Sequence, residues 1–282
     1  MFERMENNNI WVGPEAQRKI DAIIEGGAEN LHVLADFDRT LTLPSNYTSW
    51  AVLAASGLFP QEYVDRRQEL FDQYHPFEID PDVDHVLRNE KLVEWWQKHL
   101  DLIIEFKITK DQIAEVAAKP EFFKLRPGVK EALAELNDKG IPVIIVSAAV
   151  GNFIQSLLDR EGLDYSNIHI ISNILQFDEE GIVTGIETYE TPIHVGNKDE
   201  KDLPPIVKEL INGRENVIVL GDTIDDIKMA NLPQTDTVLT IGFLERNIEA
   251  NRPSFRNAFD LVLEDEQPFD GVNEIINKLR TK

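Results

Sequence analysis

Residues 31–42 read LHVLADFDRTLT, and this stretch decides how the chain is organised. The largely apolar residues 31–35 run directly into Asp36, which is the pattern of a buried strand that ends in a carboxylate. Asp38 follows two residues later, so both carboxylates can point at one site just past the strand. Their like charges are costly to hold together without a cation, and an all-oxygen ligand set suits Mg²⁺. An isolated pair of this spacing is also common in solvated turns, so the rest of the chain decides between these interpretations.

The same pattern recurs where two further apolar runs end. Residues 141–146 run into Ser147, and residues 217–220 are followed, after one glycine, by Asp222. Helical patterns lie between these runs, and strands that alternate with helices predict an α/β fold with a parallel sheet. Because ligands bind at the carboxyl edge of such a sheet, we expect Asp36, Ser147 and Asp222 to meet there. The other predicted elements are helices at 14–24, 129–139, 152–161, 203–211 and 272–279, a helix starting at Asp226, strands at 168–172, 237–241 and 261–263, and a hairpin over 175–190.

A long stretch between the first and second strands carries helical patterns and no convincing strand. It runs from about residue 44 to residue 119 and includes helical patterns over 61–74 and 87–106. A helical stretch inserted at this point can fold as a separate lid over the sheet edge. We therefore expect a catalytic core made of residues 1–43 and 118–282 and a helical cap of residues 44–117 that governs substrate choice.

Composition excludes several kinds of protein. The 282 residues include 51 acidic and 28 basic side chains, which gives a net charge of −23, and no cysteine. The charge argues against a polymeric nucleic acid as partner, and the missing cysteines exclude disulfides, thiolate metal sites and a cysteine nucleophile. The longest apolar run, residues 141–150, is too short to span a bilayer. We expect a soluble, cytoplasmic protein, monomeric or weakly oligomeric, with no membrane partner.

Ser147, Ala148 and Lys198 carry groups that suit a phosphate-binding pocket. Ser147 and Ala148 follow a strand, where small residues let backbone N–H groups approach an anion, although a strand-capping serine is the simpler interpretation for Ser147 alone. Lys198 lies in a polar loop, where most lysines are simply solvated. Three aspartates stand between Asp222 and Asp226, where they can cap a helix or complete a metal site, and their density favours the metal.

In this order the motifs resemble the signature of the haloacid dehalogenase (HAD) superfamily of phosphohydrolases, which reads D-x-D-x-T, then Ser or Thr, then Lys, then G-D-x-x-x-D. Residues 36–40 match the first motif and residues 221–226 match the last. A more specific match, from about Pro14 to the C-terminus, resembles the cytosolic 5′-nucleotidase III (pyrimidine 5′-nucleotidase) family. The segments that carry it are 36–42, 75–81, 92–96, 167–173, 217–226 and 241–244.

The resemblance implies a HAD-like Rossmannoid sheet flanked by helices, with an inserted helical cap after the first strand. It implies a phosphoric monoester hydrolase in which Asp36 is the nucleophile, forms an aspartyl-phosphate, and Asp38 is the general acid and base. Mg²⁺ would be held by Asp36, by the backbone carbonyl of Asp38, by Asp222 and by Asp226. The phosphoryl oxygens would be bound by Ser147, the Ala148 N–H group and Lys198.

The resemblance also implies that the cap reads the base of a nucleoside 5′-monophosphate. It places base contacts at Glu78 and His99, and Trp96 shares a helix face with His99, where it can stack on a base or simply pack in the core. A tryptophan at position 96 resembles members acting on 7-methylguanosine monophosphate as well as cytidine monophosphate, so the base can be a pyrimidine, as in CMP or UMP, or 7-methylguanine. The chain departs from the family pattern at Arg39, His99, Ala149 and Asp225.

Two other interpretations stay open at this point. The same chemistry could serve another small phosphomonoester. Alternatively, the fold could be a non-catalytic module that binds phosphate or another protein, against which the retained Asp36, Asp38, Lys198 and Asp222 argue.

Overall fold

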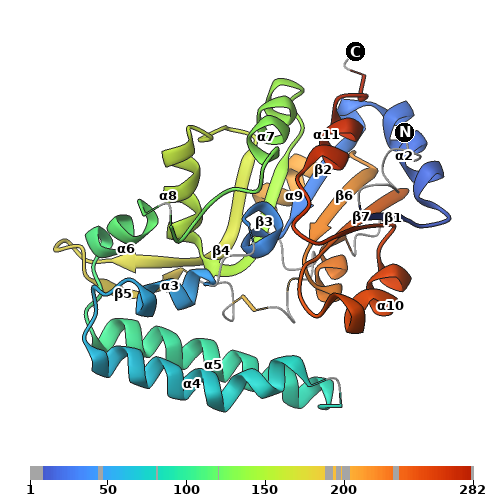
Figure 1. The fold of residues 1–282 in the computed structure, drawn as a ribbon. Helices are drawn as coiled ribbons and strands as arrows, with labels where there is room; N and C mark the ends of the chain where they lie inside the picture. The colour runs from blue at the N-terminus through green and yellow to red at the C-terminus, as the bar shows by residue number, and fades with distance from the viewer. Residues whose placement is uncertain are drawn as a thin grey trace.

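An eight-stranded sheet crosses the molecule in the order β1-β8-β7-β6-β2-β3-β4-β5 (Figure 1). The computed structural model describes residues 9–43, 47–80, 82–119, 121–187, 193–194, 198, 204–230 and 235–280. The strands are β1 (Ile10–Val12), β2 (Leu31–Ala35), β3 (Val143–Val150), β4 (Ile168–Phe177), β5 (Val183–Glu187), β6 (Asn216–Gly221), β7 (Thr237–Leu244) and β8 (Leu261–Glu264). Neighbouring strands from β8 to β4 are parallel, while β1 and β5 pair antiparallel at the two edges. The predicted α/β fold is confirmed, with an antiparallel strand added at each edge.

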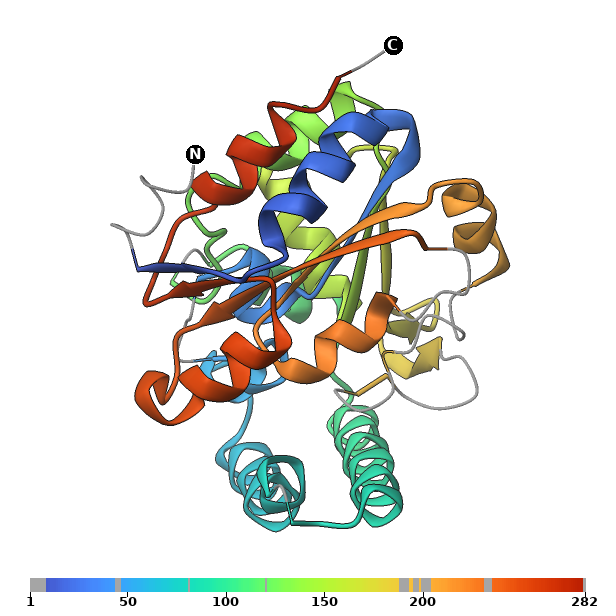
Figure 2. The ribbon, with the colours of Figure 1, turned by 90° about the vertical axis from the view of Figure 1, so that its right-hand side faces the viewer.

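Helices cover both faces of the sheet because successive strand residues point to opposite sides. On β2, Val33 and Ala35 pack into one hydrophobic cluster and Leu34 into another. The first cluster includes residues of α2 (Ala16–Gly26), α7 (Val129–Asp138), α8 (Gly151–Glu161) and α11 (Asp270–Ile276), and the second includes residues of α9 (Pro205–Ile211) and the 3₁₀ segment η5 (Ile224–Ala230). Figure 2 shows α2 and α11 on one side of the sheet and α9 on the other. The central strands are therefore buried on both faces, as their apolar sequences predict.

Between the turn after β2 and the start of α7, the described residues form four helices, where the sequence predicts a helical insertion. These are α3 (Ser49–Ala55), α4 (Gln61–Ile79), α5 (His85–Glu105) and α6 (Lys110–Ala117). Helices α4 and α5 lie side by side below the sheet in both ribbon views (Figures 1 and 2). Among the described residues, no helix combines the length and the apolar composition needed to cross a membrane. The limits of the cap, residues 44 and 117, stay a prediction.

Side-chain caps fix where these inserted helices begin. The Thr48 hydroxyl accepts a hydrogen bond from the Ala51 N–H group at 3.4 Å and so starts α3. The Asp84 carboxylate accepts from two N–H groups of the first turn of α5, at 3.0 and 3.2 Å. Thr109 and Gln112 form a reciprocal capping box at the start of α6. Each such cap stabilises its helix by about 1 kcal/mol and defines its first turn.

The second strand differs from its prediction. We expected it to end at Ser147, but β3 continues to Val150, and its register with β4 shifts between Val146 and Val150. Ser147 therefore lies in an irregular part of a strand. The strand reaches this far because the β-branched Val150 pairs again with β4, opposite Asn173.

The other predicted elements appear close to their expected positions. The hairpin over 175–190 is confirmed in its described part by the β4–β5 pair. The helix expected from Asp226 is the 3₁₀ segment η5, which starts two residues earlier. Two elements were not predicted: β1 is only three residues long, and α10 (Ile248–Ala258) is polar and contains Pro253. Neither carries an apolar pattern strong enough to mark it.

Candidate active site

The carboxyl ends of β2 and β6 place two aspartates side by side. Asp36 directly follows β2, and its N–H group donates to the Leu220 carbonyl of the neighbouring β6 at 2.9 Å. Gly221 ends β6, and a Cβ atom there would lie 2.4 Å from the Cβ of Asp226. Only glycine therefore lets the backbone after β6 fold back closely enough to bring Asp222 and Asp226 beside Asp36.

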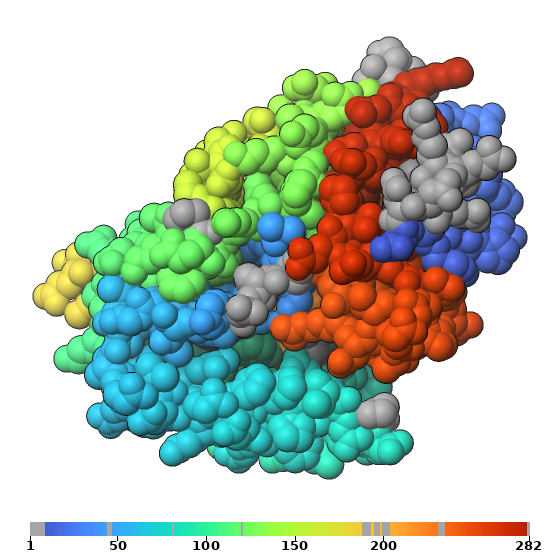
Figure 3. All heavy atoms as spheres, in the orientation of Figure 1, coloured from blue at the N-terminus to red at the C-terminus, as the bar shows by residue number. Residues whose placement is uncertain are grey.

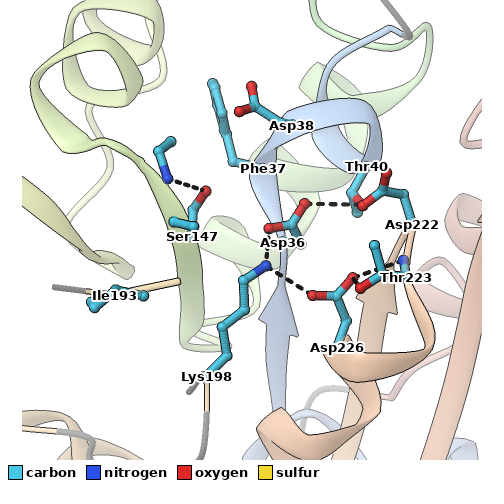
Figure 4. A network of polar contacts seen from close by, with 12 residues as sticks. Asp36, Phe37, Asp38, Thr40, Ser147, Ile193, Lys198, Asp222, Thr223 and Asp226 are labelled. Carbon is cyan, nitrogen blue, oxygen red and sulfur yellow. Dashed lines mark hydrogen bonds and ion pairs between the residues drawn. The ribbon is translucent and has the colours of Figure 1, made fainter. Parts of the chain in front are cut away.

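Three segments that are distant in sequence meet in one network of charged groups (Figure 4). The Lys198 ammonium contacts Asp36 Oδ1 and lies 2.8 Å from Asp226 Oδ1. The N–H group and the hydroxyl of Thr223 both donate to Asp226 Oδ2 at 2.9 Å. Carboxylate oxygens of Asp36, Asp222 and Asp226 all lie within 4.8 Å of one another. The structure thus brings together the nucleophile, the lysine and the two metal-site aspartates that the sequence predicts.

This network is short of positive charge. Burial, together with repulsion from Asp226 and Asp222, raises the pKa of Asp36 well above its ordinary value, although Lys198 opposes the shift. Burial and the Asp226 charge likewise raise the pKa of Asp222 to about 7. Burial alone would lower the pKa of Lys198, but the attraction of Asp226 and Asp36 outweighs it and raises that pKa. A buried, all-oxygen set of three close carboxylates fits a hard divalent cation such as Mg²⁺.

The Asp38 carboxylate does not join this cluster. Figure 4 shows it pointing away from Asp36, and its Oδ2 accepts a hydrogen bond from the Ser49 N–H group, at the start of α3, at 3.3 Å. Burial raises the pKa of Asp38, while the Ser49 bond and the charge of Arg39 act against the rise. A carboxyl group with a raised pKa can hold and release a proton nearer neutrality, which suits a general acid and base.

Asp225, the third aspartate of its motif, is not part of the metal-site cluster. Its carboxylate lies 3.1 Å from Nη2 of Arg88 on α5 and 2.6 Å from Nζ of Lys228. The sequence grouped it with Asp222 and Asp226, and that grouping was wrong. Successive residues of a tight turn point in different directions, so three neighbouring aspartates cannot all reach one ion.

Ser147 lies across from Asp36 in Figure 4, on the irregular part of β3. Its hydroxyl accepts a hydrogen bond from the Ala149 N–H group at 3.2 Å. The Ala148 carbonyl accepts from Trp50 Nε1 at 2.7 Å. These bonds fix the backbone around Ala148, whose N–H group the sequence predicts to bind phosphate. Of the neighbours of Lys198, Gly196 and Asn197 lie outside the described residues.

The predicted base contacts lie in the inserted helices. Trp96 is 8% exposed, and its ring packs 4.7 Å from that of Trp50 and 5.5 Å from that of Trp95. His99 is also buried, and burial together with the charge of Arg67 lowers its pKa to about 3. Trp95 and Trp96 are thus both part of the packed interior. In this arrangement the ring of Trp50 covers one side of the Trp96 ring.

Glu78 is only partly buried, near the end of α4. Burial raises its pKa, and the charges of Arg39, Arg88 and Lys198 oppose the rise. Those three cations lie in the core and on α5, so Glu78 lies within electrostatic reach of the charged groups at the sheet edge. The space-filling view shows the surface hollowed between α4–α5 and α10 (Figure 3).

Sequence reasoning missed two residues that connect the inserted helices to the sheet edge. Ser49 bonds to Asp38 through its N–H group, and its hydroxyl accepts from the Val150 N–H group at 3.2 Å. Trp50 joins Ala148 to the ring of Trp96. The only sequence signal is Thr48, a good N-cap, which marks a helix start but not its contacts.

The sheet with its acidic carboxyl edge and its lysine defines the class of protein, a phosphatase of the HAD fold. A substrate-bound phosphoserine phosphatase shares this fold, with a TM-score of 0.54 and 16% identity over 89% of this chain and 98% of that one. The family model for pyrimidine 5′-nucleotidase (UMPH-1) matches residues 44–280, and the chain belongs to this family.

Close relatives confirm this placement. The chain is 33% identical to the human 7-methylguanosine phosphate-specific 5′-nucleotidase over 276 residues, covering 93% of this chain and 89% of the relative. It is 32% identical to the Drosophila melanogaster protein of the same name, over 91% of this chain and 82% of that one. A crystal structure of cytosolic 5′-nucleotidase IIIB bound to cytidine superposes with a TM-score of 0.87 at 29% identity, over 96% of this chain and 93% of that one. The predicted family is confirmed, and the chain is an enzyme of the 5′-nucleotidase type.

Proposed function

We propose that this enzyme hydrolyses nucleoside 5′-monophosphates to nucleoside and phosphate through an aspartyl-phosphate on Asp36. The observation that carries the proposal is the buried Asp36 carboxylate, which Lys198 contacts beside Asp222 and Asp226 at the carboxyl edge of the sheet. A carboxylate oxygen of Asp36 attacks phosphorus as the bond from phosphorus to the 5′ oxygen breaks. Asp38 donates a proton to that leaving oxygen, so the nucleoside departs as an alcohol.

The second half of the reaction returns the enzyme to its starting state. Water attacks the phosphorus of the aspartyl-phosphate, Asp38 takes the water proton, and the bond between phosphorus and Asp36 breaks. The hydrogen bond from the Ser49 N–H group fixes the orientation of the Asp38 carboxyl group at the start of α3, on the side of the turn that would face the leaving oxygen in this proposal. The pKa of Asp38, raised by burial, suits it to alternate between the two roles.

Three side chains and one backbone group would hold Mg²⁺ in this enzyme. They are the carboxylates of Asp36, Asp222 and Asp226 and, as the family resemblance implies, the carbonyl of Asp38. The bound cation would screen the phosphate charge from the carboxylate charge. Its place is supported by the burial and mutual repulsion that raise the pKa values of Asp36 and Asp222.

The phosphoryl oxygens would be bound on the other side of Asp36. Lys198 is buried against Asp36 and supplies a fixed positive charge where negative charge spreads in the transition state. The Ser147 hydroxyl and the Ala148 N–H group, on the irregular part of β3, supply neutral donors. Thr42 stabilises the turn after β2, because its hydroxyl accepts a hydrogen bond from the Arg39 N–H group at 2.9 Å.

We propose that residues 44–117 form the cap that selects the base, with Glu78, Trp96 and His99 at the base site. The named relatives act on 7-methylguanosine phosphate, and the structural relative holds cytidine, so CMP, UMP and 7-methylguanosine monophosphate are the proposed substrates. Because Trp50 covers Trp96, a base stacked on Trp96 requires these two rings to separate. We further propose a cytoplasmic enzyme, monomeric or weakly oligomeric, that acts on small nucleotides.

A phosphate-release assay on a panel of monophosphates tests this function. The panel contains CMP, UMP, 7-methylguanosine monophosphate, AMP and glucose 6-phosphate, each with Mg²⁺ and with a chelator, and Asp36→Asn serves as the inactive control. We expect CMP or 7-methylguanosine monophosphate to be hydrolysed best, and only with Mg²⁺. Equal or faster turnover of the sugar phosphate would point to another phosphomonoester. If no phosphate is released from any nucleotide, the interpretation of the fold as a non-catalytic binding module would be favoured.

A further inference from the structure

Arg126 is a charged residue that is almost fully buried close to the active site, and the reaction described above does not use it. It is 1% exposed and precedes α7, in a segment that the sequence analysis did not single out. Its guanidinium lies over the ring of Phe243 at 4.4 Å, in the layer behind the carboxyl edge of the sheet. Burying a guanidinium group costs free energy unless its N–H groups are hydrogen-bonded, so the acceptors of Arg126 indicate its structural role.

Three of its acceptors belong to the turn that carries the acid and base. Nε donates to the Thr40 carbonyl at 2.9 Å, and Nη2 donates to the Arg39 carbonyl and, at 3.5 Å, to the Thr42 carbonyl. The remaining partners anchor the guanidinium from behind: Nη1 lies 2.5 Å from Glu245 Oε1 and 2.8 Å from the Gln267 carbonyl. Arg126 therefore connects the turn after β2 to the segments that follow β7 and β8.

That turn needs an external support. Arg39 has a φ of 66°, in the left-handed region that L-residues rarely adopt, and Asp38 has a ψ of 121°, so the chain reverses sharply there. Such a conformation persists only when its surroundings over-determine it. The turn places Asp38 toward Ser49, while its Arg39 side chain lies 3.6 Å from Asp222. Its shape therefore fixes the acid and base relative to the nucleophile.

We propose that Arg126 is a positioning residue for catalysis. By holding the Arg39 and Thr40 carbonyls it fixes the turn, and with it the place of the Asp38 carboxyl group. The inference rests on the proposed hydrolysis, in which Asp38 moves the protons. This role requires an arginine. The planar guanidinium group can donate to several acceptors at once, whereas the ammonium group of a lysine cannot reach all of them.

The decisive variant is Arg126→Lys, which keeps the charge and loses the fork. Arg126 touches neither the phosphate site nor the base site, so we expect kcat to fall roughly 10- to 100-fold, the effect of misplacing a reacting group by about 1 Å, with KM changed less than twofold. Hydrogen–deuterium exchange of the peptide covering residues 36–43 should rise in the same variant. Glu245→Gln keeps the fold and weakens the anchor of the guanidinium, so it should lower kcat in the same direction by less.

Arg214→Lys is the matched control. Arg214 also gathers backbone carbonyls, those of Ala28 at 2.8 Å and Leu31 at 2.7 Å, but at the opposite end of β2. A purely structural role predicts that both lysine variants lower the melting temperature and leave kcat alone. We expect only the Arg126 variants to lose kcat. Millimolar guanidinium should restore part of the lost kcat in Arg126→Ala and leave the kcat of Arg214→Ala unchanged.

The outcomes separate this inference from the proposed function. Unchanged kcat and unchanged exchange of residues 36–43 in both Arg126→Lys and Glu245→Gln would overturn the positioning role. Should Arg126→Lys fail to fold, Glu245→Gln alone decides, with the same two measurements. If the wild-type enzyme releases no phosphate from any nucleotide, the proposed function fails, while the exchange measurement still tests whether Arg126 holds the turn.

Discussion

Two buried groups of side chains, one at the edge of the sheet and one in the inserted helices, are built in opposite ways. At the sheet edge, Asp36 and Asp226 share the Lys198 ammonium, and further donors complete the network. In the helices, the rings of Trp95 and Trp96 pack closely, yet neither indole Nε1 has a hydrogen-bond partner among the described residues. The first group is satisfied in its hydrogen bonds but unbalanced in charge. The second is well packed but leaves polar atoms unpaired.

This difference separates the two tasks of the enzyme. The sheet-edge group is held by the ends of central strands, so its geometry changes little and suits bond making and breaking. The aromatic group is held mainly by side-chain packing between α3 and α5, with one hydrogen bond from Trp50 to the Ala148 carbonyl, and not by the ends of strands. The Nε1 of Trp96 and the Nε2 of His99 are buried without a hydrogen-bond partner among the described residues, and in the proposed function a bound base would supply one after the rings separate. Changes in the first group should alter kcat, and changes in the second should alter KM.

Asp36→Asn should have the largest effect. It removes the attacking carboxylate oxygen, so we expect kcat to fall roughly 10⁴-fold or more while the fold is retained. Steady-state assays and circular dichroism measure this. Asp225→Asn is the matched control, because Asp225 pairs with Arg88 and Lys228 instead of joining the cluster. Comparable loss in both variants would contradict the separate roles of these aspartates.

Removing Mg²⁺ should have the second-largest effect on activity. We expect a chelator to abolish phosphate release and added Mg²⁺ to restore it, because the close carboxylates of Asp36, Asp222 and Asp226 repel one another without a cation. Calorimetry gives a readout without turnover: Mg²⁺ should raise the melting temperature of the wild-type protein and raise it less in Asp222→Asn. Equal stabilisation of both proteins would place the metal elsewhere.

Trp96→Ala should act on binding. Stacking of a base on an aromatic ring contributes about 1–3 kcal/mol, so KM for the best nucleotide should rise roughly 10-fold or more with a smaller change in kcat. Trp95→Leu is the comparison, because Trp95 packs against Tyr74 and Leu92 and should lower the melting temperature without raising KM. An unchanged KM in Trp96→Ala would make Trp96 a core residue only.

His99 should give the smallest effect, as a pH dependence of stability. Burial lowers its folded pKa from 6.5 to about 3, so below pH 6.5 the unfolded chain gains a proton that the folded chain cannot accept. The contribution of neutral His99 is therefore present above pH 6.5 and is lost as the pH falls toward 3.

Denaturant melts at several pH values measure this loss. Between pH 6.5 and about 5.5, the stability of the wild-type protein should fall by about 1 kcal/mol more than that of His99→Phe. His85→Gln, at an exposed position on the same helix, should behave as wild type. Parallel pH curves for wild type and His99→Phe would show that His99 is open to solvent.

The sequence by itself determined the sheet and the order of its motifs. The apolar residues of β2, β3 and β6 are local signals of buried strands, and the aspartates directly after β2 and β6 indicated where the carboxylates would lie. The helical insertion was equally visible, because amphipathic periodicity needs no knowledge of distant contacts. The family was identified from its resemblance to segments spread along the chain, among them 75–81, 92–96, 167–173 and 241–244.

Only the tertiary structure decided which neighbours each side chain has. It placed Lys198 against Asp36, turned Asp225 toward Arg88, and revealed Arg126 beneath the Asp38 turn. Nothing local marks these pairings, because a lysine in a loop and an arginine before a helix look the same in sequence whether they are solvated or buried. Local sequence sets backbone shape, whereas burial and ion pairing depend on residues that lie far apart along the chain and meet only when the sheet and its helices are assembled.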